Sequence, residues 1–305
     1  MSERTIREAL HQASSLLLRD GIEDARRQAQ LIMEKVLGWN RTQFLLGMDE
    51  PFPQEKEAEL ESMVERRSQG EPLQYIIGEQ EFYGLPFQVN PAVLIPRPET
   101  ELLVEEVIKR GQACWADELH PPQVLDVGTG SGAIAITLAV QCPNWRITAS
   151  DISEAALATA RKNALLNEVA DRIDFVQGDL LAPWLSQRKG SVAREQSQDC
   201  FAYDILVSNP PYISEEDIAG LQLEVRSYEP HTALSGGADG LRIYARLCEQ
   251  LKQLARKPRL VALEVGKGQH EAVSRMLKTV GAWNEMTVIP DLAGIQRHVI
   301  AFRSK

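Results

Sequence analysis

The segment at residues 124–139, VLDVGTGSGAIAITLA, constrains the fold of this chain more than any other. It places a short β-rich run directly before a glycine turn and a helical stretch. Glycines after a strand permit left-handed backbone and let a ligand approach the main chain, because no Cβ stands in the way. The turn consists of Gly128, Thr129, Gly130, Ser131 and Gly132. We therefore predict a strand, a nucleoside cradle and a helix, with a tight turn that binds nothing as the alternative.

Short β-rich runs alternate with helical stretches over residues 100–305, which is typical of doubly wound α/β domains. We expect strands at residues 123–127, 146–150, 173–177, 203–207, 260–265, 283–289 and 297–302. Seven strands fit one sheet, so the sequence predicts a doubly wound, seven-stranded, Rossmann-like domain. The polar residues 186–199 have no apolar period and are predicted to form a surface loop.

Residues 1–70 carry a different pattern, in which apolar side chains recur at helical spacing, as in Ile6, Leu10 and Leu17. Gly21 and Gly38 interrupt the pattern where helices should end. This predicts a small helical domain. Residues 71–99 instead alternate large apolar and polar side chains around glycines, which predicts a β-hairpin that links the two domains.

The composition limits the partners and the compartment. The chain has 33 Lys and Arg against 43 Asp and Glu, a net charge of -10. Surfaces that bind nucleic acid or anionic membrane broadly are basic, so neither partner is expected, although a local basic patch stays open. No apolar run reaches membrane-spanning length, and the four cysteines lack metal-ligand spacing. We expect a cytoplasmic monomer without a metal.

An aspartate lies in or after each of the first three predicted strands. Asp126 is within the first, Asp151 follows the second and Asp179 follows the third. Asp151 lies roughly twenty residues past the glycines, where a carboxylate accepts hydrogen bonds from ribose hydroxyls. Asp179 could accept from an adenine amino group while Leu180 packs on the ring; a solvated loop aspartate is the equal alternative. Asp126 stands just ahead of the glycines, where it orders the turn, faces the positive end of the ligand or is purely structural.

The fourth predicted strand ends in NPPY. A planar amide or an exocyclic amine has a delocalised nitrogen lone pair and is a poor nucleophile. Asn209 Oδ1 and the Pro210 carbonyl could accept its two hydrogens, orient the nitrogen and localise the lone pair. Pro210 and Pro211 add rigidity, and Tyr212 offers a ring face for stacking. The loop therefore predicts a site for a planar NH2 group, with a loop that only ends the strand as the alternative.

The first and fourth strands are neighbours in the usual doubly wound order, so the Asn209 loop is expected to face the Gly128 turn across one crevice. One loop would hold the molecule that gives up a chemical group, and the other loop would hold the molecule that receives it. A sulfonium donor needs little acid–base chemistry, because its leaving thioether is neutral. We therefore assign no general base.

With DVGTGSG, Asp151 and NPPY in this order, the chain resembles class I S-adenosylmethionine-dependent methyltransferases that modify planar amino groups. The stretches QGEPLQYIIGEQEFYGLPFQV, LIPRPETELLVE, NPPYI and SYEPHTALSGGADGL further resemble the HemK/PrmC family of protein glutamine methyltransferases, over nearly the whole chain. The resemblance implies S-adenosyl-L-methionine as the methyl donor. It also implies that the substrate is the glutamine in the GGQ loop of class-1 peptide chain release factors, docked with help from the helical domain and the hairpin.

The resemblance also assigns roles by position. It implies that the glycine turn and Asp151 hold the donor, that Asp179 or Leu180 lies beside the adenine, and that the NPPY loop holds the glutamine. Asn209 is expected to border the donor as well. Leu94 stands where some relatives place an aromatic residue, and Leu180 replaces a tryptophan of some members, so neither position supplies a ring contact.

Three further charged residues stand in the stretches that carry the resemblance. Arg97 and Glu99, in IPRPETE, either border the donor pocket or pair with each other in a structural role. Glu229, in SYEPHTAL, either orders the acceptor loop or forms an exposed salt bridge, which would contribute little stability.

Other functions stay open as alternatives. The same chemistry could act on a glutamine of a ribosomal protein or on an adenine amine in nucleic acid, although the latter needs base flipping and a basic channel. The intact NPPY loop argues against the alternative that the protein is a nucleotide-binding scaffold without activity. An oxidoreductase is opposed by the glycine spacing.

Overall fold

The structure, a computed structural model, describes residues 4–185 and 203–304. The chain forms two compact units. The helical unit consists of the residues up to Glu79 together with Gln222–Tyr228, and the α/β unit consists of the remaining residues. The surface loop predicted at residues 186–199 lies outside the described residues.

The helical unit is built on amphipathic helices whose apolar faces meet in one core. Its elements are α1 (Ile6–Arg19), α2 (Ala25–Leu37), α3 (Arg41–Leu46), η1 (Gln54–Lys56), α4 (Glu57–Ser68), α5 (Leu73–Ile77) and α11 (Leu223–Tyr228). Thr5 and Glu8 form a capping box that fixes the start of α1. Gly38 adopts φ 67° and ends α2, as its position in the sequence predicts.

One piece of the helical unit comes from far along the chain. Arg67 and Glu224 form an ion pair of 2.8 Å, and the Tyr228 hydroxyl donates to the Gln69 carbonyl over 3.1 Å. No pattern in the sequence around residues 222–228 indicates that they belong to the helical domain. Because Leu221 and Glu229 belong to the α/β unit, the chain passes from one unit to the other and back within this segment.

A β-hairpin lies within the predicted range 71–99, but it spans only residues 79–88, and residues 73–77 of that range form helix α5 instead. Its strands are β1 (Glu79–Phe82) and β2 (Leu85–Gln88). The two turn residues, Tyr83 and Gly84, both have positive φ, 54° and 72°. Such a pair matches the twist of the two strands in a two-residue hairpin loop.

The α/β unit contains one seven-stranded sheet, which confirms the predicted fold class. Its strands are β3 (Gln123–Val127), β4 (Arg146–Asp151), β5 (Ile173–Gln177), β6 (Ile205–Ser208), β7 (Leu260–Glu264), β8 (Glu285–Pro290) and β9 (Gln296–Phe302). Their order in the sheet is β5-β4-β3-β6-β7-β9-β8. The first five are parallel, and β9 is antiparallel to both of its neighbours.

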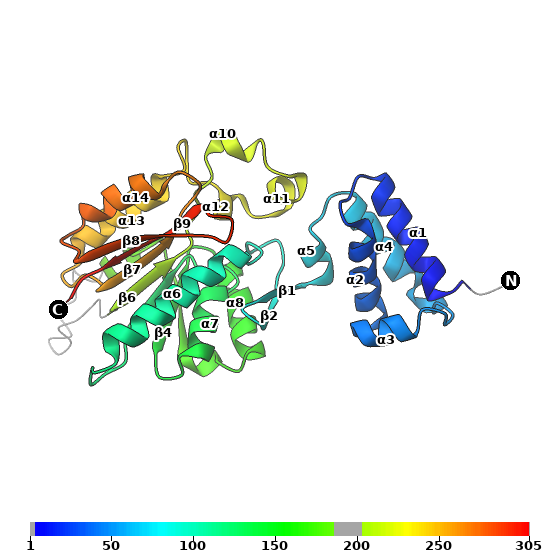
Figure 1. The fold of residues 1–305 in the computed structure, drawn as a ribbon, viewed down its shortest axis with the longest axis horizontal. Helices are drawn as coiled ribbons and strands as arrows, with labels where there is room; N and C mark the ends of the chain where they lie inside the picture. The colour runs from blue at the N-terminus through cyan, green and yellow to red at the C-terminus, as the bar shows by residue number, and fades with distance from the viewer. Residues whose placement is uncertain (1–3, 186–202, 305) are drawn as a thin grey trace. The chain divides into compact units, whose positions relative to one another are not determined.

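Helices cover both faces of this sheet, with α6 (Pro98–Trp115), α7 (Ala133–Gln141) and α8 (Glu154–Leu166) on one face and α13 (Arg242–Gln253) and α14 (His270–Lys278) on the other (Figure 1). Val124 packs in the first of these layers and Leu125 in the second. Successive strand residues face opposite layers, so the central strands are apolar throughout. The short elements are η2 (Ala170–Arg172), α9 (Ala182–Leu185), α10 (Glu215–Ile218) and α12 (His231–Leu234).

Gly111 allows α6 to pack closely against the sheet. A Cβ at this position would lie 2.2 Å from Trp145 Cη2 and 3.3 Å from Ile205 Cδ1. Gly111→Ala is therefore expected to lower the free energy of unfolding by about 1–3 kcal/mol, even though alanine favours a helix. Lys109→Ala, at an exposed position of the same helix, is the control. Urea unfolding measures both variants, and a Gly111→Ala protein as stable as the control would contradict this account of the packing.

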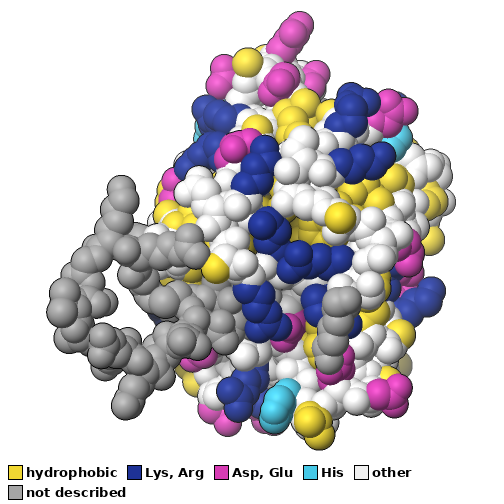
Figure 2. Space-filling view, turned by 90° about the vertical axis from the view of Figure 1, so that its left-hand side faces the viewer, with side chains coloured by type: hydrophobic (Ala, Val, Ile, Leu, Met, Phe, Trp, Pro, Cys, Tyr) yellow, Lys and Arg dark blue, Asp and Glu magenta, His cyan; other side chains and the backbone are white. Residues whose placement is uncertain are grey.

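Lys and Arg side chains gather on the face shown in Figure 2. A hollow at the amino ends of the strands is lined by Arg146, Arg256, Lys257, Arg259 and Arg303, together with acidic residues. Arg256 pairs with Asp204, and Arg259 pairs with Glu118. The local basic patch that the composition left open thus exists, but it carries charges of both signs.

Membrane-spanning helices and metal clusters are absent from the part of the chain that the structure describes. There, no helix combines the length and the apolar character needed to span a bilayer. No three His, Cys, Asp or Glu side chains within residues 4–185 and 203–304 gather where they could hold a metal ion. Cys142 and Cys248 are buried free thiols, and burial raises the pKa of Cys142 to about 11, which keeps it protonated at neutral pH.

Candidate active site

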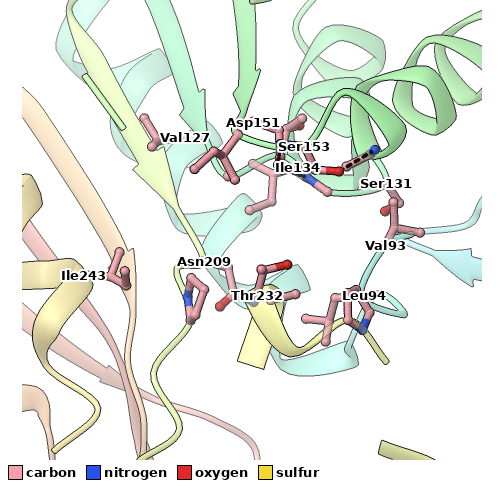
Figure 3. A pocket seen from close by; sticks show the side chains of 18 of the residues that line it. Val93, Leu94, Val127, Ser131, Ile134, Asp151, Ser153, Asn209, Thr232 and Ile243 are labelled. Carbon is pink, nitrogen blue, oxygen red and sulfur yellow. Dashed lines mark hydrogen bonds between the residues drawn. The ribbon is translucent and has the colours of Figure 1, made fainter. Parts of the chain in front are cut away.

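A cavity of about 520 Å³ opens at the carboxyl ends of β3, β4, β5 and β6. Parallel sheets bind ligands at this edge, where the strand order reverses. Figure 3 shows Asp151 and Ile134 on one side of the cavity and Asn209 and Thr232 on the other. The predicted residues that line it are Gly128, Thr129, Gly130, Ser131, Asp151, Asp179, Leu180, Asn209 and Pro211.

The three glycines of the turn have two different tasks. All have positive φ, 74° at Gly128, 56° at Gly130 and 85° at Gly132. A Cβ at Gly128 or Gly130 would meet nothing within 4 Å, so the space beside them is open to a ligand. A Cβ at Gly132 would lie 2.7 Å from Ile136 Cδ1, and this glycine is not among the residues that line the cavity. Gly132 therefore allows close packing of the helix, while Gly128 and Gly130 leave room for a ligand beside the turn.

Asp126 orders the turn from within the sheet. It is fully buried, and its Oδ2 accepts a 2.6 Å hydrogen bond from the Thr129 hydroxyl. Burial raises the pKa of Asp126 to about 7, and the hydrogen bonds from Thr129 and from the Ala135 backbone oppose that rise. Of the roles considered for Asp126, ordering the turn is the one that these contacts support.

Asp151, at the end of β4, lies beside the glycine turn. Its Oδ2 accepts from the Gly130 backbone N–H and its Oδ1 from the Ser153 backbone N–H, both over 2.9 Å. Burial raises the pKa of Asp151, and these two hydrogen bonds oppose the rise. A carboxylate has about four acceptor positions, so two remain for hydroxyl groups of a ligand in the cavity.

Asp179 and Leu180 line the cavity after β5. The Asp179 carboxylate forms an ion pair with Arg246 of α13, a partner that the sequence analysis did not identify. Both side chains are more than 40% exposed, so the pair contributes little stability and exchange with a ligand would cost little. Leu180 packs against the core layer of α13 and α14. Their contacts with adenine stay a prediction.

The NPPY loop begins where β6 ends, and only part of it reaches the cavity. Asn209 and Pro211 line the cavity, whereas Pro210, which is buried, and Tyr212 do not. Asn209 Nδ2 donates to the Thr100 hydroxyl over 3.1 Å. The Tyr212 ring packs against the core layer of α13 and α14, and burial raises the pKa of its phenol. The acceptor role of the Pro210 carbonyl and the stacking role of Tyr212 therefore stay predictions.

Of the two alternatives for Arg97 and Glu99, the structure does not show the pairing of the two with each other, and Arg97 but not Glu99 lines the cavity. Arg97 lines the cavity and forms an ion pair with Glu229, whose carboxylate also accepts from the Ile95 backbone N–H over 3.4 Å. The Glu229 side chain is only 1% exposed, so the alternative of an exposed salt bridge is wrong. The pair ties the segment before α6 to the segment before α12, a contact between residues 132 positions apart in the sequence.

Several residues of the site were missed in the sequence analysis. Thr100, in the first turn of α6, lines the cavity and donates to Glu264 Oε2 over 2.7 Å. Glu264, the last residue of β7, is 2% exposed, and burial raises its pKa to about 7. A carboxylate at the end of a buried apolar strand was the available signal for Glu264. Leu94, which the sequence analysis did name, lines the cavity beside Val93, as Figure 3 shows, and supplies an aliphatic wall.

Known proteins match the chain over nearly its whole length. Residues 8–78 match the PrmC N-terminal domain, and residues 99–223 match the methyltransferase small domain. A release factor glutamine methyltransferase of Moorella thermoacetica is 39% identical over 299 residues, which cover 98% of this chain and 99% of that protein. One of Bacillus subtilis is 38% identical over 302 residues and 99% of each chain.

Solved structures resemble the fold at lower identity. The hMettl16 catalytic domain, in complex with MAT2A 3'UTR hairpin 1, superposes with a TM-score of 0.52 and 18% identity, over 85% of this chain and 84% of that one. The human methyltransferase 10 domain containing protein has the same TM-score and identity, over 73% and 90% of the two chains. At this identity the likeness concerns the fold alone.

Proposed function

Because the chain belongs to the family of release factor glutamine methyltransferases, we propose that it methylates the GGQ glutamine of class-1 peptide chain release factors, with S-adenosyl-L-methionine as methyl donor. The observation that carries this proposal is one cavity that brings Asn209 of the NPPY loop opposite Asp151 and the glycine turn. The acceptor is then the side-chain amide nitrogen of glutamine. The helical unit is assigned to docking of the release factor.

The residues of the cavity fit this donor. The open space beside Gly128 and Gly130 admits a ligand against the main chain, and Asp151 has acceptor positions left for ribose hydroxyls. Asp179 and Leu180 would border the adenine. When bound, the donor supplies an electrophilic methyl group on a sulfonium centre, whose leaving group is a neutral thioether.

The residues of the NPPY loop would make the amide nitrogen nucleophilic. Asn209 Oδ1 and the Pro210 carbonyl accept the two hydrogens of the glutamine NH2 group and hold its plane fixed. The nitrogen lone pair is thereby directed toward the donor side of the cavity. An N-alkylated amide cation is very acidic and loses its proton to water, so no side chain is assigned as a base.

The test is methyl transfer from labelled donor to three purified acceptors: a class-1 release factor, ribosomal protein and DNA. We expect label on the release factor, mapped by mass spectrometry to the GGQ glutamine. A release factor with that glutamine replaced by alanine should take up no label. Label on DNA or ribosomal protein, with none on the release factor, would overturn the choice of substrate.

A further inference from the structure

The sheet register places Asn209 beside a second polar residue. β6 and β7 are parallel neighbours, and Ser208 stands opposite Leu263. The residues that come next are Asn209, just after β6, and Glu264, the last residue of β7. Leu260 to Leu263 are all fully buried, and Glu264 is 2% exposed, so this strand ends in a carboxyl group held inside the protein.

Thr100 joins the two side chains. The Thr100 hydroxyl donates to Glu264 Oε2 over 2.7 Å. The hydroxyl oxygen Oγ1 of Thr100 also accepts from Asn209 Nδ2 over 3.1 Å. The three residues lie on three different elements, since Thr100 belongs to α6, Asn209 follows β6 and Glu264 ends β7. Thr100 itself is 4% exposed, so water does not compete freely for these hydrogen bonds.

The chemistry of the groups fixes the direction of these hydrogen bonds. An ionised carboxylate only accepts, so the Thr100 hydroxyl points its hydrogen at Glu264. The oxygen of that hydroxyl must then accept, and the group of Asn209 that can donate to it is Nδ2. A second interaction between Asn209 and Glu264 lowers the pKa of Glu264, as expected for an amide N–H near the carboxylate. The nitrogen end of the Asn209 carboxamide is thus held by Thr100 and Glu264.

We propose that Thr100 and Glu264 are positioning residues that keep Asn209 Oδ1 facing the acceptor amide. The proposal rests on the proposed transfer to an amide nitrogen, for which Asn209 must present its oxygen and not its NH2 group. With the carboxamide reversed, Asn209 would offer two donors to a substrate that also offers two donors. Glu264 would therefore set the polarity of the site without touching the substrate.

The free-energy cost of burying an ionised carboxylate at Glu264 supports a specific role for this side chain. Burial disfavours its ionised form and raises its pKa to about 7, and Glu99 adds to the rise, while Thr100, Arg297 and Asn209 oppose it. A leucine would continue the apolar strand without this cost. The position of Glu264 is fixed further by its backbone carbonyl, which accepts from the Tyr244 hydroxyl over 2.7 Å.

The segment after Glu264 also holds the far end of the NPPY loop. Gln269 Nε2 donates to the Tyr212 carbonyl over 2.9 Å, and Gln269 Oε1 accepts from the Gly266 backbone N–H over 3.0 Å. Residues 264–269 thus anchor the loop at both ends, through Thr100 at Asn209 and through Gln269 at Tyr212. One short segment after β7 therefore determines where the loop lies and which way Asn209 faces.

Thr100→Val and Thr100→Ser form the matched pair that tests the proposal. Valine keeps the shape of threonine and removes the hydroxyl, whereas serine keeps the hydroxyl. At pH 8, above the raised pKa of Glu264, we expect Thr100→Val to lower kcat roughly tenfold or more through misorientation of Asn209, with an unchanged Kd for the donor. Thr100→Ser should restore most of the activity. Thr137→Val, a buried threonine of α7 outside the cavity, controls for the loss of a buried hydroxyl.

Two outcomes would overturn the proposal. Equal activity of Thr100→Val and Thr100→Ser would mean that the hydroxyl positions nothing. A parallel loss of donor affinity and kcat in Thr100→Val, absent from Thr100→Ser, would make Thr100 a residue of the donor pocket instead.

A second measurement needs no substrate and so separates this proposal from the proposed function. Solvent exchange of the Asn209 side-chain amide protons, followed by NMR and assigned by their loss in Asn209→Ala, reports whether Nδ2 is held. We expect slow exchange in the unchanged protein and in Thr100→Ser, and at least tenfold faster exchange in Thr100→Val. Equal exchange in all three would contradict the proposal even if release factor is methylated. Slow exchange that depends on Thr100 would support it even if another substrate is found.

Discussion

Replacing Asn209 by alanine is expected to lower kcat roughly a hundredfold or more, the loss that follows removal of one oriented polar group from an active site. The affinity for S-adenosyl-L-methionine should change much less, because the glycine turn and Asp151 stay in place on β3 and β4. Asn209→Ala removes both the acceptor oxygen and the hydrogen bond to Thr100. Single-turnover methylation of release factor measures the first effect, and calorimetric titration with the donor measures the second.

Asn284→Ala provides the control for this variant, because Asn284 is an exposed asparagine outside the cavity. It should methylate release factor at the rate of the unchanged protein. If Asn209→Ala instead loses donor binding and turnover to a similar degree, Asn209 is a residue of the donor site, and the assignment of the NPPY loop to the acceptor is wrong.

Asp151→Ala should show the reverse pattern, with donor binding affected first. The carboxylate would lose its hydrogen bonds to the ribose, each worth about 1.5–3 kcal/mol for a charged acceptor, so the Kd for the donor should rise tenfold to a hundredfold or more. The turn would also lose the 2.9 Å hydrogen bond from the Gly130 N–H. At saturating donor, kcat should recover in large part.

Asp151→Asn is the matched variant, because it keeps the shape and one acceptor oxygen. An intermediate Kd is expected. A variant series in which donor affinity is constant while kcat falls would show that Asp151 acts on the acceptor or on the chemical step, and the ribose assignment would then be withdrawn.

Much of the α/β fold could be predicted because its central strands are buried on both faces. Such strands are continuous apolar runs, and the predicted ends of 123–127 and 173–177 agree with β3 and β5. The predicted start at Tyr203 is two residues before β6, although the Asp204 backbone already donates to the Gln123 carbonyl and accepts from the Arg259 N–H, both over 2.8 Å. Periodicity alone does not separate a strand from the extended residue that leads into it.

The assignment of residues 222–228 could not be predicted in this way. The segment forms one short helix, too short for a clear apolar period, and it joins the helical unit through Arg67, Gln69 and Gly70. Leu223 lies against Gly70, where a Cβ would come within 2.7 Å of Leu223 Cδ2. These are contacts between parts of the chain more than 150 residues apart, and no local pattern encodes them.

The residues of the site also differ in whether local sequence motifs or only long-range contacts identify them. The glycine turn, Asp151 and Asn209 stand at strand ends, and the neighbouring positions of β3 and β6 bring them to one cavity, as the doubly wound order predicts. The partners of these residues come from elsewhere: Thr100 is 109 residues from Asn209 and 164 from Glu264. Motifs therefore identified many of the residues that line the cavity, and the tertiary structure was needed to identify the side chains that contact them.

A crystal structure with the demethylated donor product and a GGQ-containing release factor tests the central claim most directly. The account predicts that the glutamine nitrogen lies in line with the sulfur across the cavity, and that its two hydrogens reach Asn209 Oδ1 and the Pro210 carbonyl. A glutamine nitrogen far from the sulfur, or bound by other side chains while the NPPY loop stays unengaged, would contradict it.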